Sequence, residues 1–139
     1  LSCSRFKNDF LIERYLTPQP RVKLGIALRG IATSAMDISD GLMQDLGHIC
    51  AASNVGSNIY TNKIPTTNNQ QLTTALTGGD DYELLFTAPP EQNGAIKNLA
   101  KSLDIPISCI GKIIPKDGVQ ALDKSGNKIT LSKKGFLHF

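Results

Sequence analysis

The segment from Ser34 to Ser53 constrains the fold more than any other part of the sequence. Its beginning, Ser34 to Ile38, is a short and mostly apolar run that predicts a buried strand. From Gly41 to Ser53, apolar residues recur at the spacing of an amphipathic helix: Leu42, Met43, Leu46, Ile49 and Cys50. A strand that leads directly into an amphipathic helix predicts a layered structure, in which helices pack on a sheet.

Glycine and proline divide the rest of the chain into short apolar segments. Residues 59–64, 82–88 and 107–114 are rich in β-branched or aromatic residues and predict strands, and 119–122 with 129–131 predict a terminal hairpin. Helical spacing predicts helices over 8–16, 22–31, 72–76 and 95–103, with a loop over 66–71. We therefore expect residues 1–139 to form a single α/β (α+β) domain, with helices on a mixed, mostly antiparallel sheet.

Composition excludes several classes of protein. With 40% hydrophobic and 19% charged residues, the chain resembles an average folded domain. The net charge of +3 comes from scattered lysines, so nucleic-acid binding is not expected. No apolar run approaches the roughly 18 residues of a membrane span, and the first residues lack the pattern of a signal peptide, so we expect no membrane association and a cytoplasmic location.

The cysteines and histidines do not form a recognisable metal or disulfide pattern. Cys3, Cys50 and Cys109 are odd in number and widely spaced, which matches neither a disulfide framework nor a zinc site. Cys50 and Cys109 lie in apolar stretches, so both are expected to be buried, reduced thiols. His48 and His138 are far apart in the sequence, and neither is predicted to bind metal.

The first candidate site is the segment Asp37-Ile38-Ser39-Asp40-Gly41 between the predicted strand and helix. Carboxylates such as Asp37 and Asp40 are hard oxygen ligands that suit Mg²⁺, and Ser39 with the amides of a helix N-terminus could hold a phosphate oxygen. The alternative is an ordinary helix N-cap, for which serine and aspartate are common. Asp37 favours the functional interpretation, because an unpaired charge in an apolar strand would be costly.

Two further stretches combine unusual residues. Gly78-Gly79-Asp80-Asp81 permits a tight turn and could bind metal or a cationic ligand, although a solvated surface turn is the commoner explanation. Glu83 is expected to point away from Tyr82, and no role is predicted for it. The closing Gly135–Phe139 is rich in aromatic residues, which predicts either core packing or an aromatic wall for a flat heterocycle.

In this order, the three stretches resemble the thiamine-monophosphate kinase family, which has Asp-Ile-Ser-Asp-Gly-Leu, Gly-Gly-Glu-Asp-Tyr-Glu-Leu and a closing Gly-aromatic-x-His-Phe. The lead-in Arg14–Gly25 and the segment Ser108–Lys112 are also similar. The family belongs to a superfamily with aminoimidazole ribonucleotide synthetase and selenophosphate synthetase, whose members pair two α/β domains around an ATP site. The resemblance implies that residues 1–139 are the C-terminal domain of such an enzyme.

The resemblance implies ATP-dependent phosphorylation of thiamine monophosphate to thiamine diphosphate with Mg²⁺. It implies that Asp37 and Asp40 bind metal and that Ser39 contacts the nucleotide. It also implies that Asp80 and Phe136 contact the substrate. No catalytic residue is assigned. Two positions depart from the family: it has glutamate where this chain has Asp80, and tryptophan or tyrosine where it has Phe136.

The implied partners are the protein's own N-terminal domain and a second copy in a homodimer, and the 139-residue chain is expected to be inactive when isolated. Two alternatives stay open. One is another ATP-using enzyme of the superfamily, of the selenophosphate synthetase or hydrogenase-maturation type. The other is a noncatalytic binding module.

Overall fold

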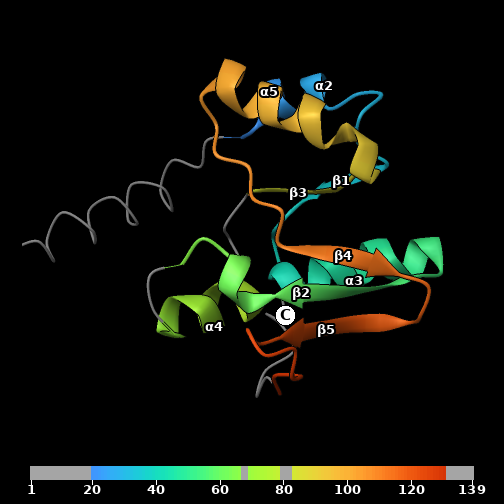
Figure 1. Cartoon of the computed structure of the whole chain (residues 1–139), viewed down its shortest axis with the longest axis vertical. Helices are drawn as coiled ribbons and strands as arrows, with labels where there is room; N and C mark the ends of the chain where they lie inside the picture. The colour runs from blue at the N-terminus through green and yellow to red at the C-terminus, as the bar shows by residue number, and fades with distance from the viewer. Residues whose placement is uncertain (1–19, 67–68, 79–82, 131–139) are drawn as a thin grey trace, which may run out of the picture.

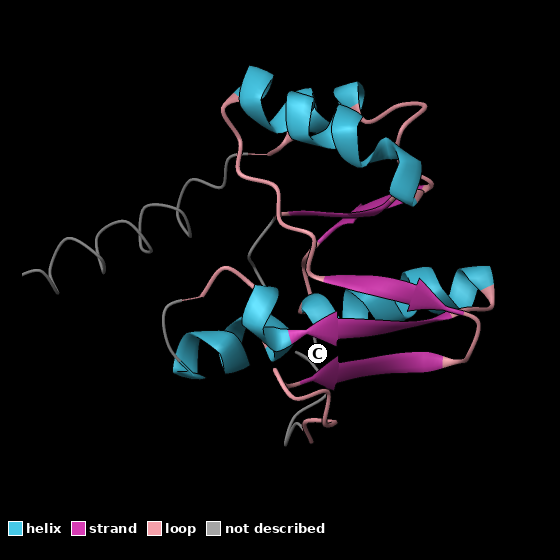
Figure 2. Cartoon of the chain, in the orientation of Figure 1, coloured by secondary structure: helices cyan, strands magenta, loops and turns pink. Residues whose placement is uncertain are grey.

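The computed structural model describes residues 20–66, 69–78 and 83–130, and within them helices pack on two small sheets (Figures 1 and 2). The predicted helix over 8–16 lies outside these residues. In chain order the elements are α2 (Val22–Ala27), β1 (Ser34–Asp37), α3 (Leu42–Ser53), β2 (Gly56–Tyr60), the 3₁₀ helix η1 (Thr61–Lys63), α4 (Asn69–Thr77), β3 (Leu84–Thr87), the 3₁₀ helix η2 (Pro90–Gln92), α5 (Asn93–Leu103), β4 (Gly111–Ile114) and β5 (Gly118–Leu122).

The strands form two sheets instead of the single sheet expected. β1 pairs antiparallel with β3 in one sheet. In the other, β2 is central, antiparallel to β4 and parallel to β5. The α2 and α5 helices contact each other beside the β1–β3 pair, whereas α3 packs against β2 and β5 (Figure 1). The predicted class, helices on mixed and mostly antiparallel sheets, is confirmed.

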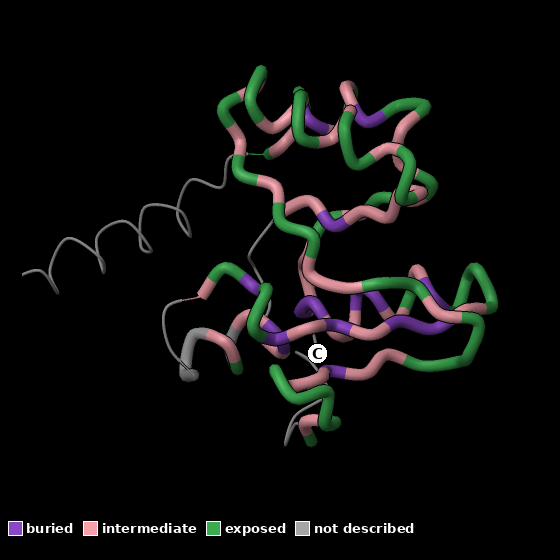
Figure 3. Tube along the Cα trace, viewed as in Figure 1, coloured by how far each residue is buried: buried purple, intermediate pink, exposed green. Residues whose placement is uncertain are grey.

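The main core lies between α3 and the three-stranded sheet (Figure 3). The apolar face of α3 contributes Leu42, Leu46 and Cys50, which cluster with Ile59 of β2 and Leu76 of α4. Each fully buried leucine or isoleucine contributes about 1.5–3 kcal/mol relative to an exposed one, so this face holds α3 firmly on the sheet. The predicted amphipathic helix is confirmed, and its N-terminus is consequently fixed relative to β2 and α4.

Several predicted boundaries were wrong. The second helix ends at Ala27 instead of continuing to residue 31, and the chain then turns through Gly30 at φ +77°. The strand expected over 59–64 starts earlier, at Gly56, and ends at Tyr60, where η1 begins. The helix expected over 72–76 also starts earlier, at Asn69, which shortens the predicted loop.

The strand expected over 107–114 is restricted to β4, because β2 pairs with it only from Gly56↔Ile114 to Ile59↔Gly111. The terminal hairpin is present only in part. The main partner of β5 is β2, and the later segment contributes one bridge between Leu122 and Lys128.

Burial also departs from expectation. β1 is not a buried strand: it alternates between half-buried and exposed residues. Cys50 is buried as expected, but Cys109 is exposed. Across residues 20–66, 69–78 and 83–130, no helix has the length and apolar character needed to cross a membrane.

Candidate functional site

The first candidate residues lie where β1 ends and α3 begins. Asp37 is the last residue of β1 and is exposed, whereas Ser39 and Asp40 are half-buried in the loop to α3. The backbone amide of Ile38 donates to the Glu83 carbonyl at 2.9 Å, so the loop starts beside β3. Since Asp37 is at the surface, its charge needs no metal or cation to offset burial. The predicted burial of Asp37 was therefore wrong, although its placement at a strand end was right.

The buried carboxylate of this region is Asp45, which no sequence pattern singled out. Asp45 is 1% exposed, and its Oδ2 atom accepts hydrogen bonds from the backbone amides of Ser39 at 2.9 Å, Asp40 at 3.1 Å and Gly41 at 3.2 Å. These three amides precede the helix and are bonded to Asp45, so the phosphate contact expected of Ser39 and the helix N-terminus stays a prediction. The N-cap residue of α3 is Gly41, which has no side chain, so ordinary capping by serine or aspartate is not observed.

The Asp40 side chain is oriented by the first turn of α3. Gln44 donates from Nε2 to Asp40 Oδ2 at 3.1 Å. Asp40, Asp45 and His48 each offer one ligand atom, and these atoms lie within 4.8 Å of one another. The i, i+3 spacing of Asp45 and His48 on α3 is the sequence signal for this pair, whereas the approach of Asp40 depends on how the loop folds back over the helix.

The structure brings Gly41 of the first candidate segment close to Thr77 and Gly78, at the start of the second candidate segment. Gly41 has φ +114°, and a Cβ atom placed there would be 3.0 Å from the Gly78 carbonyl oxygen and 3.0 Å from the Thr77 carbonyl carbon. Glycine is required here for both reasons. Gly78 lies at the end of α4, and Glu83 is bonded to Ile38, so residues on both sides of segment 79–82 contact the β1–α3 loop. Asp80 belongs to that segment and lies outside the described residues, as does Phe136.

Glu83, for which no role was predicted, forms a bidentate ion pair with Arg21. Arg21 donates from Nε to Oε2 at 2.9 Å and from Nη2 to Oε1 at 2.9 Å. The hydrogen bond to Glu83 raises the pKa of Arg21. The pair ties the start of α2 to the residue that precedes β3. No local signal could reveal it, because the partners are 62 residues apart.

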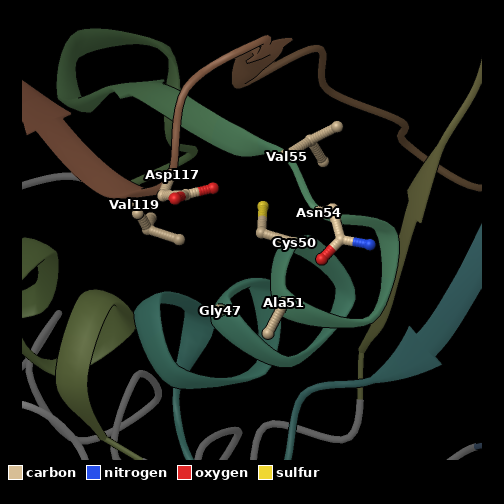
Figure 4. A pocket seen from close by; sticks show the side chains of 8 residues that line it. Gly47, Cys50, Ala51, Asn54, Val55, Asp117 and Val119 are labelled. Carbon is tan, nitrogen blue, oxygen red and sulfur yellow. The ribbon is translucent and has the colours of Figure 1, made fainter.

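A cavity of about 340 Å³ lies away from this loop, beside the C-terminal half of α3 (Figure 4). Its walls include Cys50 of α3 with Asn54 and Val55 just after the helix, and Asp117 of the β4–β5 turn with Val119 of β5. None of the predicted site residues that the structure describes lines it.

Comparison with known proteins identifies the family. The model of the family described as AIR synthase related protein, C-terminal domain, matches residues 11–124. The chain belongs to this family. Among its relatives, the thiamine-monophosphate kinase of Escherichia coli K12 is 41% identical over 94% of the chain and 43% of the relative. The resemblance seen in the motifs is thereby confirmed.

Solved structures of thiamine-monophosphate kinases match the fold of the chain. The crystal structure of thiamine-monophosphate kinase from Stenotrophomonas maltophilia K279a matches with a TM-score of 0.75 and 44% identity, covering 78% of the chain and 37% of that protein. AaThiL complexed with AMPPCP and TMP matches with a TM-score of 0.73 and 32% identity, covering 93% of the chain and 41% of that protein. The chain therefore spans less than half the length of the relatives it matches.

Proposed function

We propose that this chain forms part of an enzyme that transfers the γ-phosphate of ATP to thiamine monophosphate, yielding thiamine diphosphate. The observation that carries the proposal is the contact of Gly41, in the acidic β1–α3 loop, with Thr77 and Gly78, at the start of the second candidate segment. Relatives named thiamine-monophosphate kinase support it, as does a relative solved with AMPPCP and TMP. Phosphoryl transfer depends chiefly on positioning and charge neutralisation, for which an acidic loop held by several contacts is suitable.

The β1–α3 loop fits Mg²⁺ by its chemistry. Asp37 and Asp40 offer carboxylate oxygens, the ligands that Mg²⁺ takes alongside substrate phosphates, and the exposed Asp37 is accessible to a metal-nucleotide complex. When bound, the metal supplies neutralising charge for the phosphates. In this proposal Asp37 and Asp40 hold the metal, and Ser39 contacts the nucleotide.

In this proposal Asp80 and Phe136 contact thiamine monophosphate. The described residues on either side of the segment that holds Asp80, Gly78 and Glu83, contact the β1–α3 loop, and this supports the proposed role of Asp80. Aspartate is one methylene shorter than the glutamate of the family, so any contact it makes with thiamine monophosphate reaches less far. Phe136 has no polar group at its ring edge and could offer only an apolar and aromatic surface.

We also infer that the site is completed by a further domain. The chain covers 43% of the Escherichia coli relative, which leaves most of that protein to contribute ligands and ATP contacts. The isolated chain should then produce no thiamine diphosphate. A homodimeric assembly, implied by the resemblance, and a cytoplasmic location, expected from the sequence, stay predictions.

The proposal is tested by incubating the intact protein with Mg-ATP and thiamine monophosphate and measuring thiamine diphosphate by chromatography, with the 139-residue chain assayed in parallel. We expect product from the intact protein and none from the chain. A folded intact protein that forms no product would refute the proposed activity. Product from the isolated chain would refute the composite site.

A further inference from the structure

We infer that Asp45 is a positioning residue for the β1–α3 loop, whose carboxylate fixes the backbone from which Ser39 and Asp40 reach the metal-nucleotide complex. The inference deepens the proposed function and depends on it for the identity of the ligand. The hydrogen bonds that define the role are all made between groups of the chain itself.

The environment of Asp45 supports a fixed structural anion. The residue is 1% exposed, and burying a carboxylate is costly unless donors satisfy it. Three successive amides, from Ser39 to Gly41, converge on its Oδ2 atom. Backbone amides that point inward in this way form a concave anion-binding arrangement, and here the anion comes from the chain itself.

Two neighbouring residues of α3, Gln44 and Asp45, hold the loop by hydrogen bonds. Asp45 fixes the loop backbone, and Gln44 donates to the Asp40 carboxylate from the neighbouring position of α3. Leu42 and Leu46 hold α3 in the core, so the loop that is hydrogen-bonded to α3 is held in a fixed position as well. Metal ligands on a preorganised backbone bind with a smaller loss of conformational entropy than ligands on a mobile loop.

Asp45 lies near Asp40 and His48, but we assign it a positioning role and not a metal contact. Its Oδ2 atom is occupied by three donors, whereas Asp37 is exposed at the strand end. Removing the charge of Asp45 should therefore weaken Mg²⁺ dependence by releasing the loop, while every proposed ligand stays in the chain. This predicts a change in the Mg²⁺ concentration for half-maximal rate that is larger than the change in kcat.

The test uses Asp45→Asn in the intact protein, with Asp104→Asn as the matched control. Asp104 is exposed at the C-terminus of α5 with φ 52°, a conformation that asparagine also accepts, so the control loses the same charge at a tolerant position. Two quantities are measured: hydrogen exchange of amides 39–41 without metal or nucleotide, and thiamine diphosphate formation as a function of Mg²⁺.

For Asp45→Asn we expect amides 39–41 to exchange about tenfold faster or more, since each loses a hydrogen bond to a charged group. We also expect the half-saturating Mg²⁺ concentration to rise about tenfold, with kcat reduced less. Asp45→Glu retains the charge on a longer side chain. Its amide exchange rates and its half-saturating Mg²⁺ concentration should fall between those of the wild type and those of Asp45→Asn. It also serves as the test variant if Asp45→Asn fails to fold.

Wild-type exchange and wild-type Mg²⁺ dependence in a folded variant would overturn the inference. Faster exchange spread over the whole domain, with equal losses in kcat and Mg²⁺ affinity, would also overturn it, because that pattern indicates a general loss of stability. If the wild-type protein forms no thiamine diphosphate while amides 39–41 respond as expected, the proposed function fails, and the anchoring of the loop by Asp45 is still supported.

Discussion

Replacement of Gly41 by alanine tests whether the β1–α3 loop contacts the end of α4 at Thr77 and Gly78. The new Cβ atom would meet the carbonyl groups of Thr77 and Gly78 at 3.0 Å, and φ would remain at +114° unless the loop rearranged. Backbone strain of this kind costs about 1–3 kcal/mol. Forcing a methyl group against backbone that cannot yield costs about 1–3 kcal/mol more. We expect the free energy of unfolding to fall by roughly 2–6 kcal/mol, a large share of a typical domain's stability.

Alanine variants at two other glycines separate the cost of backbone strain from the cost of the close contact. Gly30 has φ +77°, and nothing beyond its chain neighbours lies within 4 Å of where a methyl group would sit, so Gly30→Ala carries conformational strain without a contact. It should cost about 1–2 kcal/mol. Gly47 lies within α3, with similar open space around it, so Gly47→Ala should stabilise the helix by about 0.5–1 kcal/mol.

Urea unfolding followed by circular dichroism measures all three variants. The expected order of stability is Gly47→Ala, then Gly30→Ala, then Gly41→Ala. If Gly41→Ala were as stable as Gly30→Ala, the close approach of the β1–α3 loop to the end of α4 would be refuted, and with it the observation that carries the proposed function.

Three further predictions concern the Arg21–Glu83 ion pair, the cysteines Cys50 and Cys109, and Asp123. A double-mutant cycle with Arg21→Met and Glu83→Gln should give a coupling of at most about 1 kcal/mol in urea unfolding, because Glu83 is 39% exposed and solvent screens the pair. Iodoacetamide should alkylate Cys109 in the folded chain and reach Cys50 only on unfolding, as mass spectrometry of labelled peptides would show. Hydrogen bonds, chiefly from the Asn127 amide, lower the pKa of Asp123, so an NMR titration should place its midpoint below the ordinary carboxyl value.

Each of these predictions has a contradicting outcome. A coupling well above about 1 kcal/mol in the cycle would contradict the screening of the ion pair by solvent. Equal labelling of Cys50 and Cys109 in the native state would contradict their different burial. For Asp123, a lowered pKa means that the stabilisation of its turn is present above the ordinary carboxyl pKa and is lost as pH falls through the folded value. A midpoint at or above the ordinary value would contradict this.

Elements with a strong local signal were predictable from the sequence. The stripe from Leu42 to Cys50 located α3 to within one residue at its N-terminus, because helical periodicity and burial on the sheet agree. The acidic segment before α3 was located for the same reason, since a strand followed by a helix leaves only the short connection between them. The family resemblance rested on these residues and on residues 77–86, and it is confirmed.

Features that depend on distant partners were not predictable. The bidentate bond of Glu83 joins it to Arg21, which no pattern around either residue reveals. Residues 107–110 have strand propensity, but β2 ends at Tyr60, whose amide donates to the Ile110 carbonyl at 2.8 Å, so no β2 residue is left to pair with 107–109. Asp45 carries a weak signal, a carboxylate three residues after Leu42 on an otherwise apolar face, but its role became visible only once the loop amides were located.

Whether the β1–α3 loop binds the metal is decided by the rate of thiamine diphosphate formation in the intact protein carrying Asp37→Asn, compared across Mg²⁺ concentrations with the Asp104→Asn control. Changes to residues that only contact a metal ligand already cost about 10–100-fold in affinity or activity, so loss of a ligand itself should lower kcat/KM at least tenfold. The control should stay at the wild-type value. A folded Asp37→Asn protein with the wild-type rate and Mg²⁺ dependence would contradict the assignment of the β1–α3 loop as the metal-binding part of the site.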